Sequence, residues 1–456
     1  MAHVDSASPT VENAPVAIVG GGFAGLSAAY ELVQQGAAPI VFERDSVVGG
    51  LAGSFEVKGQ RLEKFYHHWF TNDEYVMKLV NELGVEENVI YRPTRTGMYY
   101  ANDFYNLSTP LDLLQFEPLS FFNRIRLGIL ALRARMISDW RELEELTAKE
   151  WLIRMAGEEV YEVVWEPLLK GKFGPYAEEV SAAWFWNKLK LRGGSRDGSG
   201  AEQLAYYDGG FASLAEQIME EIEKGGGRVL TDTLVKDLQV RDGAVEGIIT
   251  EDGTLHETSH TIFTPALPIV GDLVEPYVSE QYEERLRDVD YLANVCLILE
   301  LDRSLSDTYW LNVNDPSFPY VGVIEHTNFE PPETYGGNRI VYLSKYLPPE
   351  HKLYQMTEEE VMEFSVPHLQ RMFPEFEKSW VQDYHAWKAR YTQPVVTRHY
   401  SEKVPDRQMP IKNATLCTMA QIYPEDRGTN YAIREGRRTG RQVAEALRDD
   451  KTLEMK

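Results

Sequence analysis

A glycine pattern followed by an acid, near the start of the chain, has the residue types that bind a dinucleotide. Gly20, Gly22 and Gly25 come directly after a short apolar run, and Glu43 closes the next one. Glycines at this spacing allow a tight turn and let the backbone approach a pyrophosphate, while the acid takes ribose hydroxyls. The sequence therefore predicts a dinucleotide site in this segment.

The elements that must position this turn are a strand before it and a helix after it. The apolar run 16–19 predicts a buried strand, and residues 26–35 predict a helix that ends at Gly36. The first N–H groups of such a helix face the phosphates, which brings Phe23 and Ala24 to the cofactor. A turn without a ligand is the simpler alternative, but strand, helix and acid all stand where a binding site needs them.

A second glycine pair follows the acid at once. After Glu43 and Arg44 the chain reads Gly49, Gly50, Leu51, Ala52. This order resembles the superfamily of amine oxidases, protoporphyrinogen oxidases and phytoene desaturases, which are FAD proteins. The resemblance implies a non-covalently bound FAD, with the acid and the glycine pair in its fingerprint. The residues it implies for the cofactor here are Gly20, Gly22, Phe23, Ala24, Gly25, Glu43, Arg44, Gly49, Gly50, Leu51 and Ala52.

A second match to these flavoproteins lies in the middle of the chain. Residues 213–224 predict an amphipathic helix, and apolar runs around Val229, Val235 and Val245 predict strands. The resemblance implies that this passage closes the FAD domain and that Val235 contacts the adenine through its backbone.

A third match, residues 419–436, resembles the closing FAD motif. An acid before a glycine turn can bind the ribityl hydroxyls, which points to Asp426. The helix that starts near Thr429 would direct its positive end at the flavin, with Asn430 and Tyr431 at the flavin edge. The alternative is a capped terminal helix, since Asp and Thr are common before a helix start.

The order of these matches predicts an α/β fold whose FAD-binding part, a Rossmann-like domain, is discontinuous in sequence. With 456 residues, 43% of them apolar, the chain can form more than one domain. We predict an FAD domain from residues 13–85, 205–266 and 410–448, with an inserted α+β substrate domain from residues 86–204 and 267–409. Residues 1–12 and 449–456 are predicted to be flexible termini. Substrate chemistry is expected where the two domains meet.

Charge and cysteine content narrow the class of protein. A net charge of −25 argues against nucleic-acid partners, because these need a basic surface. Cys296 and Cys417 lie in apolar runs, which predicts buried, reduced thiols and gives no metal site. The first residues lack the basic start and apolar core of a signal peptide, so we expect a cytoplasmic protein. The oligomeric state is open.

One stretch of the inserted part, residues 111–140, is apolar at helical spacing and rich in arginine. A cationic amphipathic helix can lie on an anionic membrane, which gives a peripheral membrane contact, or form the mouth of a pocket for an apolar substrate. The more common alternative is a packed helix whose arginines face solvent.

Two histidines, His67 and His68, suggest a second possible reaction for the flavin site. The segment 63–73 resembles UDP-galactopyranose mutases, in which a similar stretch carries a histidine beside the flavin. His67 matches that histidine, while a second histidine of the mutase pattern is replaced by Phe70. The resemblance implies a role at the flavin for His67 or His68; the alternative is that both only hydrogen-bond the fold.

Other candidates lie in the second half of the inserted part. Lys345 could organise a water near the flavin, as the resemblance to amine oxidases implies, or could be a solvated lysine after a strand. Arg390, Tyr391 and Arg398 could meet an anionic substrate group, or the arginines could form structural ion pairs. Residues 164–174 and 181–186 resemble bacterial chains of the protoporphyrinogen-oxidase-like kind.

These patterns predict an FAD-dependent oxidoreductase that removes a hydride from a C–C or C–N bond of an apolar or carboxylated small molecule. A redox-neutral sugar-nucleotide mutase and a non-catalytic, FAD-stabilised module that binds a lipid or a partner remain open. Two or more arginines near the flavin would favour the sugar nucleotide of a mutase, whereas an aromatic tunnel from the amphipathic helix would favour a desaturase.

Overall fold

A parallel five-stranded sheet organises one half of the molecule. The computed structural model describes residues 15–106, 109–192 and 202–454. The sheet has the strand order β10-β2-β1-β14-β20, and every neighbouring pair is parallel. Its strands are β1 (Val16–Val19), β2 (Pro39–Phe42), β10 (Arg228–Leu230), β14 (His260–Phe263) and β20 (Ala414–Leu416). Three distant stretches of the chain therefore build one sheet.

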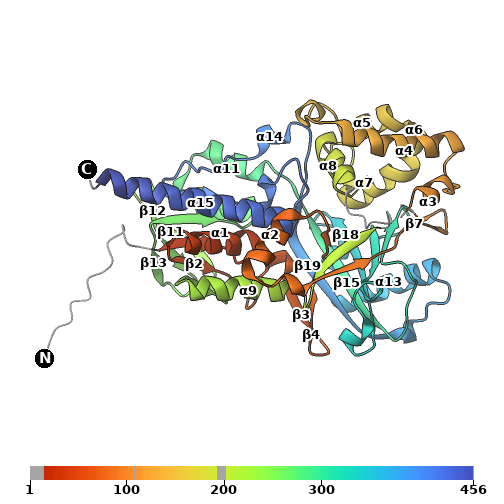
Figure 1. The fold of residues 1–456 in the computed structure, drawn as a ribbon, viewed down its shortest axis with the longest axis horizontal. Helices are drawn as coiled ribbons and strands as arrows, with labels where there is room; N and C mark the ends of the chain where they lie inside the picture. Colours follow the sequence, from red (N-terminus) through yellow and green to blue (C-terminus); the bar gives the residue numbers. More distant parts are fainter. Residues whose placement is uncertain (1–14, 107–108, 193–201, 455–456) are drawn as a thin grey trace.

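Three helices cover this sheet. They are α1 (Phe23–Gln34), α9 (Phe211–Lys224) and α15 (Thr429–Glu454). Helix α15 lies along α1 (Figure 1), and the close approach requires glycine: a Cβ on Gly436 would overlap the carbonyl oxygen of Ala24, and one on Gly440 that of Ala28. Helix α15 continues beyond the predicted boundary at residue 448 to Glu454, so most of the expected C-terminal tail is helical. Residues 1–12 lie outside the described part of the chain.

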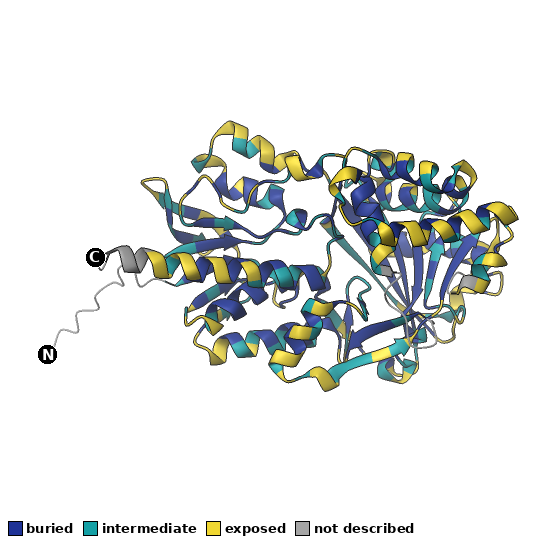
Figure 2. Ribbon diagram, turned by 45° about the horizontal axis from the view of Figure 1, so that its top comes forward, coloured by how far each residue is buried: buried dark blue, intermediate teal, exposed yellow. Residues whose placement is uncertain are grey.

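A seven-stranded sheet organises the other half. Its order is β19-β15-β18-β17-β16-β7-β8, antiparallel except for the pair β16 and β7. The strands are β7 (Thr96–Tyr100), β8 (Asp103–Asn106), β15 (Tyr291–Leu301), β16 (Trp310–Val313), β17 (Gly322–Glu325), β18 (Arg339–Leu347) and β19 (Val381–Pro394). The inner strands are buried along most of their length (Figure 2), and α13 (Glu358–Met372) packs on one face.

A group of helices lies beside the seven-stranded sheet (Figure 1). It comprises α3 (Pro110–Leu114), α4 (Phe121–Met136), α5 (Ala148–Ala156), α6 (Glu158–Val160), α7 (Glu166–Phe173) and α8 (Ala182–Arg192). The apolar stretch 111–140 is therefore not one long helix. It breaks between α3 and α4, where Pro118 lacks the N–H that a continuous helix needs.

Smaller elements complete the fold. A hairpin joins β3 (Ser54–Val57) and β4 (Gln60–Glu63), and two three-stranded sheets have the orders β5-β9-β6 and β11-β12-β13. Their strands are β5 (Trp69–Phe70), β6 (Val89–Pro93), β9 (Gln203–Tyr207), β11 (Val235–Arg241), β12 (Ala244–Thr250) and β13 (Leu255–Glu257). The remaining helices are α2 (Glu74–Leu83), α10 (Leu267–Val274), α11 (Glu280–Arg287), α12 (Lys352–Gln355) and α14 (Tyr400–Lys403).

The two cysteines are buried free thiols, Cys296 within β15 and Cys417 directly after β20. In the described part of the chain, no helix is both long and apolar enough to cross a bilayer.

Candidate functional site

A cavity of about 410 Å³ lies where the helices of the inserted part, the seven-stranded sheet and the segment before α15 meet. Its wall is mainly aromatic and aliphatic, with contributions from Trp69, Trp165, Phe173, Trp184, Phe185 and Trp310. Of the candidate residues from the sequence, it brings together Leu51, His67, His68, Asp426, Asn430 and Tyr431. A mostly apolar cavity with a few polar groups is the usual form of a small-molecule site.

The first glycine turn has two glycines that the fold requires and one that faces open space. Gly20 has a φ of +100°, and a Cβ there would overlap Thr264 Oγ1; a Cβ on Gly25 would overlap the carbonyl oxygen of Gly20. Gly22 differs, because the nearest atom to its Cβ position is Gly50 Cα at 3.8 Å. The space beside Gly22 is therefore open to a ligand, at the end of β1 where parallel sheets bind dinucleotides.

The second glycine pair lies directly against the first turn. The Gly49 N–H donates to the carbonyl oxygen of Gly21 over 2.9 Å. Gly49 and Gly50 have φ values of +112° and +60°, and a Cβ on Gly50 would stand 3.2 Å from Gly22 Cα. The two glycine motifs thus form one unit. This packed backbone, with an open side at Gly22, fits the pyrophosphate of an FAD.

Glu43 fastens the turn to the end of β2. One of its carboxylate oxygens accepts from the Gly21 N–H over 2.7 Å, and the other from the Asp45 N–H over 2.9 Å. The carboxylate keeps lone pairs for further donors, so a hydroxyl of the cofactor can share it. Arg44 is exposed and pairs with Asp45 at 3.6 Å.

His67 is neutral and has a defined tautomer. Burial lowers the pKa of His67 to about 4. Its Nδ1 lies within hydrogen-bond distance of the carbonyl oxygen of Phe65, which can only accept, so Nδ1 carries the proton. The other nitrogen, Nε2, is then an acceptor. His68 differs, because its Nδ1 shares a 3.1 Å hydrogen bond with the Tyr309 hydroxyl.

Asp426 lies at the centre of a charged cluster inside the cavity wall. Its Oδ2 accepts from Lys172 Nζ at 3.2 Å and from Lys188 Nζ at 2.7 Å, and its Oδ1 from Trp184 Nε1 at 3.0 Å. Burial alone would raise the pKa of Asp426, but the charges of Lys172, Lys188 and neighbouring Arg427 lower it well below its ordinary value. The carboxylate stays ionised and holds helices α7 and α8 to the segment before α15.

The lysines outnumber their counter-ion. Burial lowers the pKa of Lys172 to about 7, although Asp426 acts in the opposite direction. Arg427 is also buried in the wall and donates to the Tyr346 hydroxyl over 2.9 Å, while its Nε has no hydrogen-bond partner. With Lys172 protonated, three cations surround one carboxylate. The cluster around Asp426 therefore carries a local excess of positive charge suited to an anionic group, while two further acids, Asp73 and Glu202, also line the cavity.

The start of α15 forms another part of the wall. Asn430 Oδ1 accepts from the N–H groups of Tyr75 and Val76, at 3.0 and 3.1 Å, so its side chain caps α2. Tyr431 is buried beside Arg434, and Thr429 accepts from Trp69 Nε1 over 2.8 Å. The N-terminus of α15 thus opens at the cavity with its helix dipole positive there.

Other candidates from the sequence do not reach the cavity wall. Lys345 points its Nζ toward the carbonyl oxygen of Gly171 at 3.4 Å, and only its neighbour Tyr346 lines the cavity. Arg390 is exposed on β19 and lies over the ring of Tyr391. Arg398 is exposed and stands 3.9 Å from Glu150. Val235 begins β11 and is not part of this cavity, so its contact with the adenine stays a prediction.

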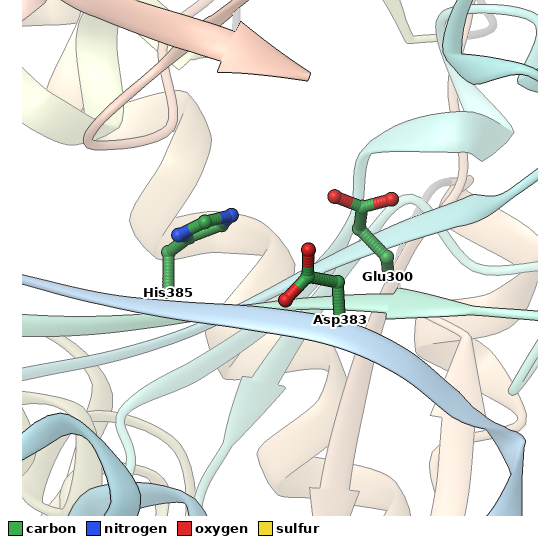
Figure 3. A group of neighbouring side chains, drawn as sticks. All are labelled: Glu300, Asp383 and His385. Atoms are coloured by element: carbon green, nitrogen blue, oxygen red, sulfur yellow. The ribbon is translucent and has the colours of Figure 1, made fainter. Parts of the chain in front are cut away.

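A group of three potential metal ligands lies elsewhere, on one face of the seven-stranded sheet. Figure 3 shows Glu300 of β15 and Asp383 and His385 of β19, whose ligand atoms lie within 4.8 Å of one another. Glu300 already accepts from Asn338 at 2.8 Å and pairs with Lys58 at 3.7 Å, and His385 packs against Phe55. Glu300 and His385 thus have partners within the protein.

Comparison with known proteins agrees with this geometry. The flavin containing amine oxidoreductase family matches residues 23–444. The chain belongs to this family. The predicted kind of protein, an FAD-dependent oxidoreductase with a Rossmann-like α/β fold, is thereby confirmed.

The relatives compared with this chain are distant. A 15-cis-phytoene desaturase from Synechococcus elongatus is 26% identical over 317 residues, which cover 64% of this chain and 66% of the relative. The chain thus spans about two thirds of that relative's length. A candidate protoporphyrinogen oxidase from Exiguobacterium has a similar fold, with a TM-score of 0.75, 15% identity and coverage of 94% and 98% of the two chains. A reduced UDP-galactopyranose mutase has a TM-score of 0.70 and 13% identity, over 94% and 95%. These two likenesses show the fold alone.

The lysines and tryptophan around Asp426 were missed by sequence reasoning. Lys172, Trp184 and Lys188 lie in or beside the segments that resemble protoporphyrinogen-oxidase-like chains, but they are far from Asp426 in sequence. The run 164–174 contains two lysines, Lys170 and Lys172. The sequence does not distinguish them, because Lys170 pairs with Glu166 at the surface and only Lys172 reaches Asp426.

Proposed function

We propose that this protein is an FAD-dependent oxidoreductase that removes a hydride from a C–C or C–N bond of a small molecule with an apolar body and an anionic group. The observation that carries the proposal is the cavity itself: aromatic walls that surround a buried cluster with surplus positive charge. An apolar substrate body fits the first feature, and a carboxylate fits the second.

We propose that residues 13–85, 205–266 and 410–448 hold the FAD and that residues 86–204 and 267–409 bind the substrate. The glycine unit around Gly22 would hold the pyrophosphate, and Glu43 the adenosine ribose. When bound, the flavin supplies the electron sink of the reaction. The protein residues orient the substrate, exclude water and place neutral His67 Nε2 as an acceptor in the wall.

The arginine content of the wall does not favour the mutase. Among the described residues that line the cavity, Arg427 alone is an arginine, and it is engaged with Tyr346. The aromatic wall is instead extensive, and part of it, Trp184 and Phe185, lies on α8, which packs against α4. No residue of 111–140 is among the described residues that line the cavity, so the aromatic wall does not come from the amphipathic helix, and it supports an apolar substrate body in general.

The test is anaerobic absorbance of the FAD-loaded protein. It is mixed in turn with protoporphyrinogen, a polyene precursor, an amine panel and UDP-galactose, before and after reduction by dithionite. We expect one of the first three classes to bleach the oxidised flavin. Turnover of the sugar nucleotide by the reduced protein alone would make the protein a mutase, and no response to any of them would leave a binding module.

A further inference from the structure

The outer face of α4 is apolar where a surface helix is normally polar. Phe121, Phe122, Leu132 and Met136 are 59%, 77%, 61% and 81% exposed, and Ile125 and Ile129 are exposed beside them. These positions lie on one side of the helix, opposite the buried residues Leu127, Leu130 and Ala134. The face is unpartnered in the described part of the chain, so it is suited to an apolar surface outside the protein.

Helix α3 extends this face. Leu111 and Leu114 are 62% and 46% exposed. Two contacts hold α3 against α4: Arg124 donates to the carbonyl oxygen of Leu114 over 2.7 Å, and Leu113 packs beside Gly128. We call the exposed side of α3 and α4 the docking face. Eight of the large apolar side chains that are exposed in the described chain belong to it: Leu111, Leu114, Phe121, Phe122, Ile125, Ile129, Leu132 and Met136.

Arginines flank the docking face on both sides. At helical spacing, Arg124 and Arg135 lie on one side of the apolar stripe of α4, and Arg126 and Arg133 on the other. The 16 residues of α4 include these four arginines and no acidic residue, in a chain whose net charge is −25. Positive charge is thus concentrated at the border of the apolar stripe, where long cationic side chains can reach lipid headgroups.

We propose that the docking face binds the surface of an anionic lipid bilayer, with α4 lying in the plane of the interface. The apolar stripe would enter the acyl boundary, and the exposed arginines beside it, Arg126, Arg133 and Arg135, would meet the phosphates. Arg124 donates instead to the backbone carbonyl oxygens of Leu114 and Leu119. A second copy of the chain fits less well, because a symmetric contact through α4 would bring the two rows of arginine together. The proposal rests on exposure and charge, and does not depend on the oxidoreductase activity.

The docking face lies one helix away from the cavity. Trp186 of α8 donates from Nε1 to the carbonyl oxygen of Ala134 in α4 over 2.6 Å. Trp184, Phe185 and Lys188 of the same helix line the cavity. A bilayer bound at α4 would therefore adjoin the site wall, which suits a substrate that partitions into lipid.

The experiment is co-sedimentation of the FAD-loaded full-length protein with vesicles. Two compositions are used: phosphatidylcholine alone, and phosphatidylcholine mixed with phosphatidylglycerol. We expect the protein to pellet with the mixed vesicles, and less as salt rises. The double variant Phe122→Ser with Met136→Ser should lower the partition coefficient roughly tenfold or more. Arg133→Gln with Arg135→Gln should lower it about tenfold on the mixed vesicles only.

A matched variant controls for loss of exposed apolar area elsewhere. Leu234 and Leu255 are 40% and 43% exposed and lie outside the docking face, so Leu234→Ser with Leu255→Ser should pellet as the wild type does. Flavin absorbance and the melting temperature confirm that each variant is folded. Failure of the wild type to pellet, or equal pelleting of the Phe122 and Met136 variant, would overturn the proposal. So would concentration-dependent self-association that this variant abolishes, because a second copy would then occupy the face.

Discussion

Lys172 Nζ and Asp426 Oδ2 lie 3.2 Å apart inside the cavity wall, which joins helix α7 to the segment before α15. Lys188 Nζ reaches the same oxygen at 2.7 Å. One carboxylate therefore holds two lysines, and it opposes the burial that lowers the pKa of Lys172. The cluster is both a link between two parts of the chain and the charged end of the candidate site.

Removing that carboxylate charge should destabilise the protein. In Asp426→Asn, Lys172 stays in the cavity wall without its counter-ion, while Lys188 is partly exposed. We expect a loss of about 3 kcal/mol in the free energy of unfolding, at the lower end for a broken buried pair. Denaturant unfolding of the FAD-free protein measures it. Asp302→Asn is the control, because Asp302 pairs with Arg303 at the surface and its loss should leave the midpoint unchanged. Equal midpoints for both variants would contradict the role of Asp426.

Binding of a carboxylate in the cavity should weaken as pH rises. The pKa of Lys172 is about 7, so Lys172 is mostly charged at pH 6 and mostly neutral at pH 8. The surplus positive charge falls across this interval, and the affinity for an anion falls with it. Octanoate binding, followed by its perturbation of the flavin spectrum, measures the effect. Lys172→Gln should flatten the dependence; a variant with the wild-type slope would assign the titration to another group.

Replacing two glycines of the first turn by alanine, one at a time, should affect different properties: FAD binding at Gly22 and folding at Gly25. Gly22 has an ordinary φ of −74° and open space at its Cβ position, so Gly22→Ala should fold but lose FAD. In Gly25→Ala the Cβ would overlap the carbonyl oxygen of Gly20, so the fold itself should suffer. The flavin-to-protein absorbance ratio and the far-ultraviolet circular dichroism separate the two results. A Gly22→Ala protein with stoichiometric FAD would show that the pyrophosphate lies elsewhere.

Glu43→Gln should weaken FAD binding and also loosen the glycine turn. Both carboxylate oxygens of Glu43 accept backbone N–H groups, and an amide presents only one acceptor oxygen. The orphaned N–H is expected to cost about 1–3 kcal/mol. Unfolding of the FAD-free protein tests the structural effect, and FAD titration tests the binding effect. If stability falls while FAD affinity is unchanged, Glu43 supports the turn and does not bind the ribose.

The local elements were predictable because their signals are local. The strand before Gly20, the helix after it and the helix 213–224 follow from apolar periodicity and glycine positions, and the structure confirms them within a few residues. The stretch 111–140 was less predictable. Its periodicity does not show that the apolar stripe of α4 faces solvent with arginines on both sides of it. Which face a helix buries depends on the elements packed against it.

The candidate site was predictable only in part. The resemblance to known flavoproteins predicted that His67, Asp426 and Asn430 lie near the flavin, and all three line the cavity. Their contacts were not foreseen: Asn430 caps α2, and Asp426 binds two lysines from the inserted helices. Lys345 and Arg390 carry suitable groups, yet neither residue lines the cavity: Lys345 Nζ lies 3.4 Å from the carbonyl oxygen of Gly171, and Arg390 is exposed.

By itself the sequence determined the cofactor class and the family, because the glycine turn, the acid and the closing motif are backbone requirements that recur at fixed spacing. Only the tertiary structure decided what surrounds Asp426 and which face of α4 meets the outside. Both depend on contacts between residues far apart in the chain, and spacing along the sequence carries no record of such distances.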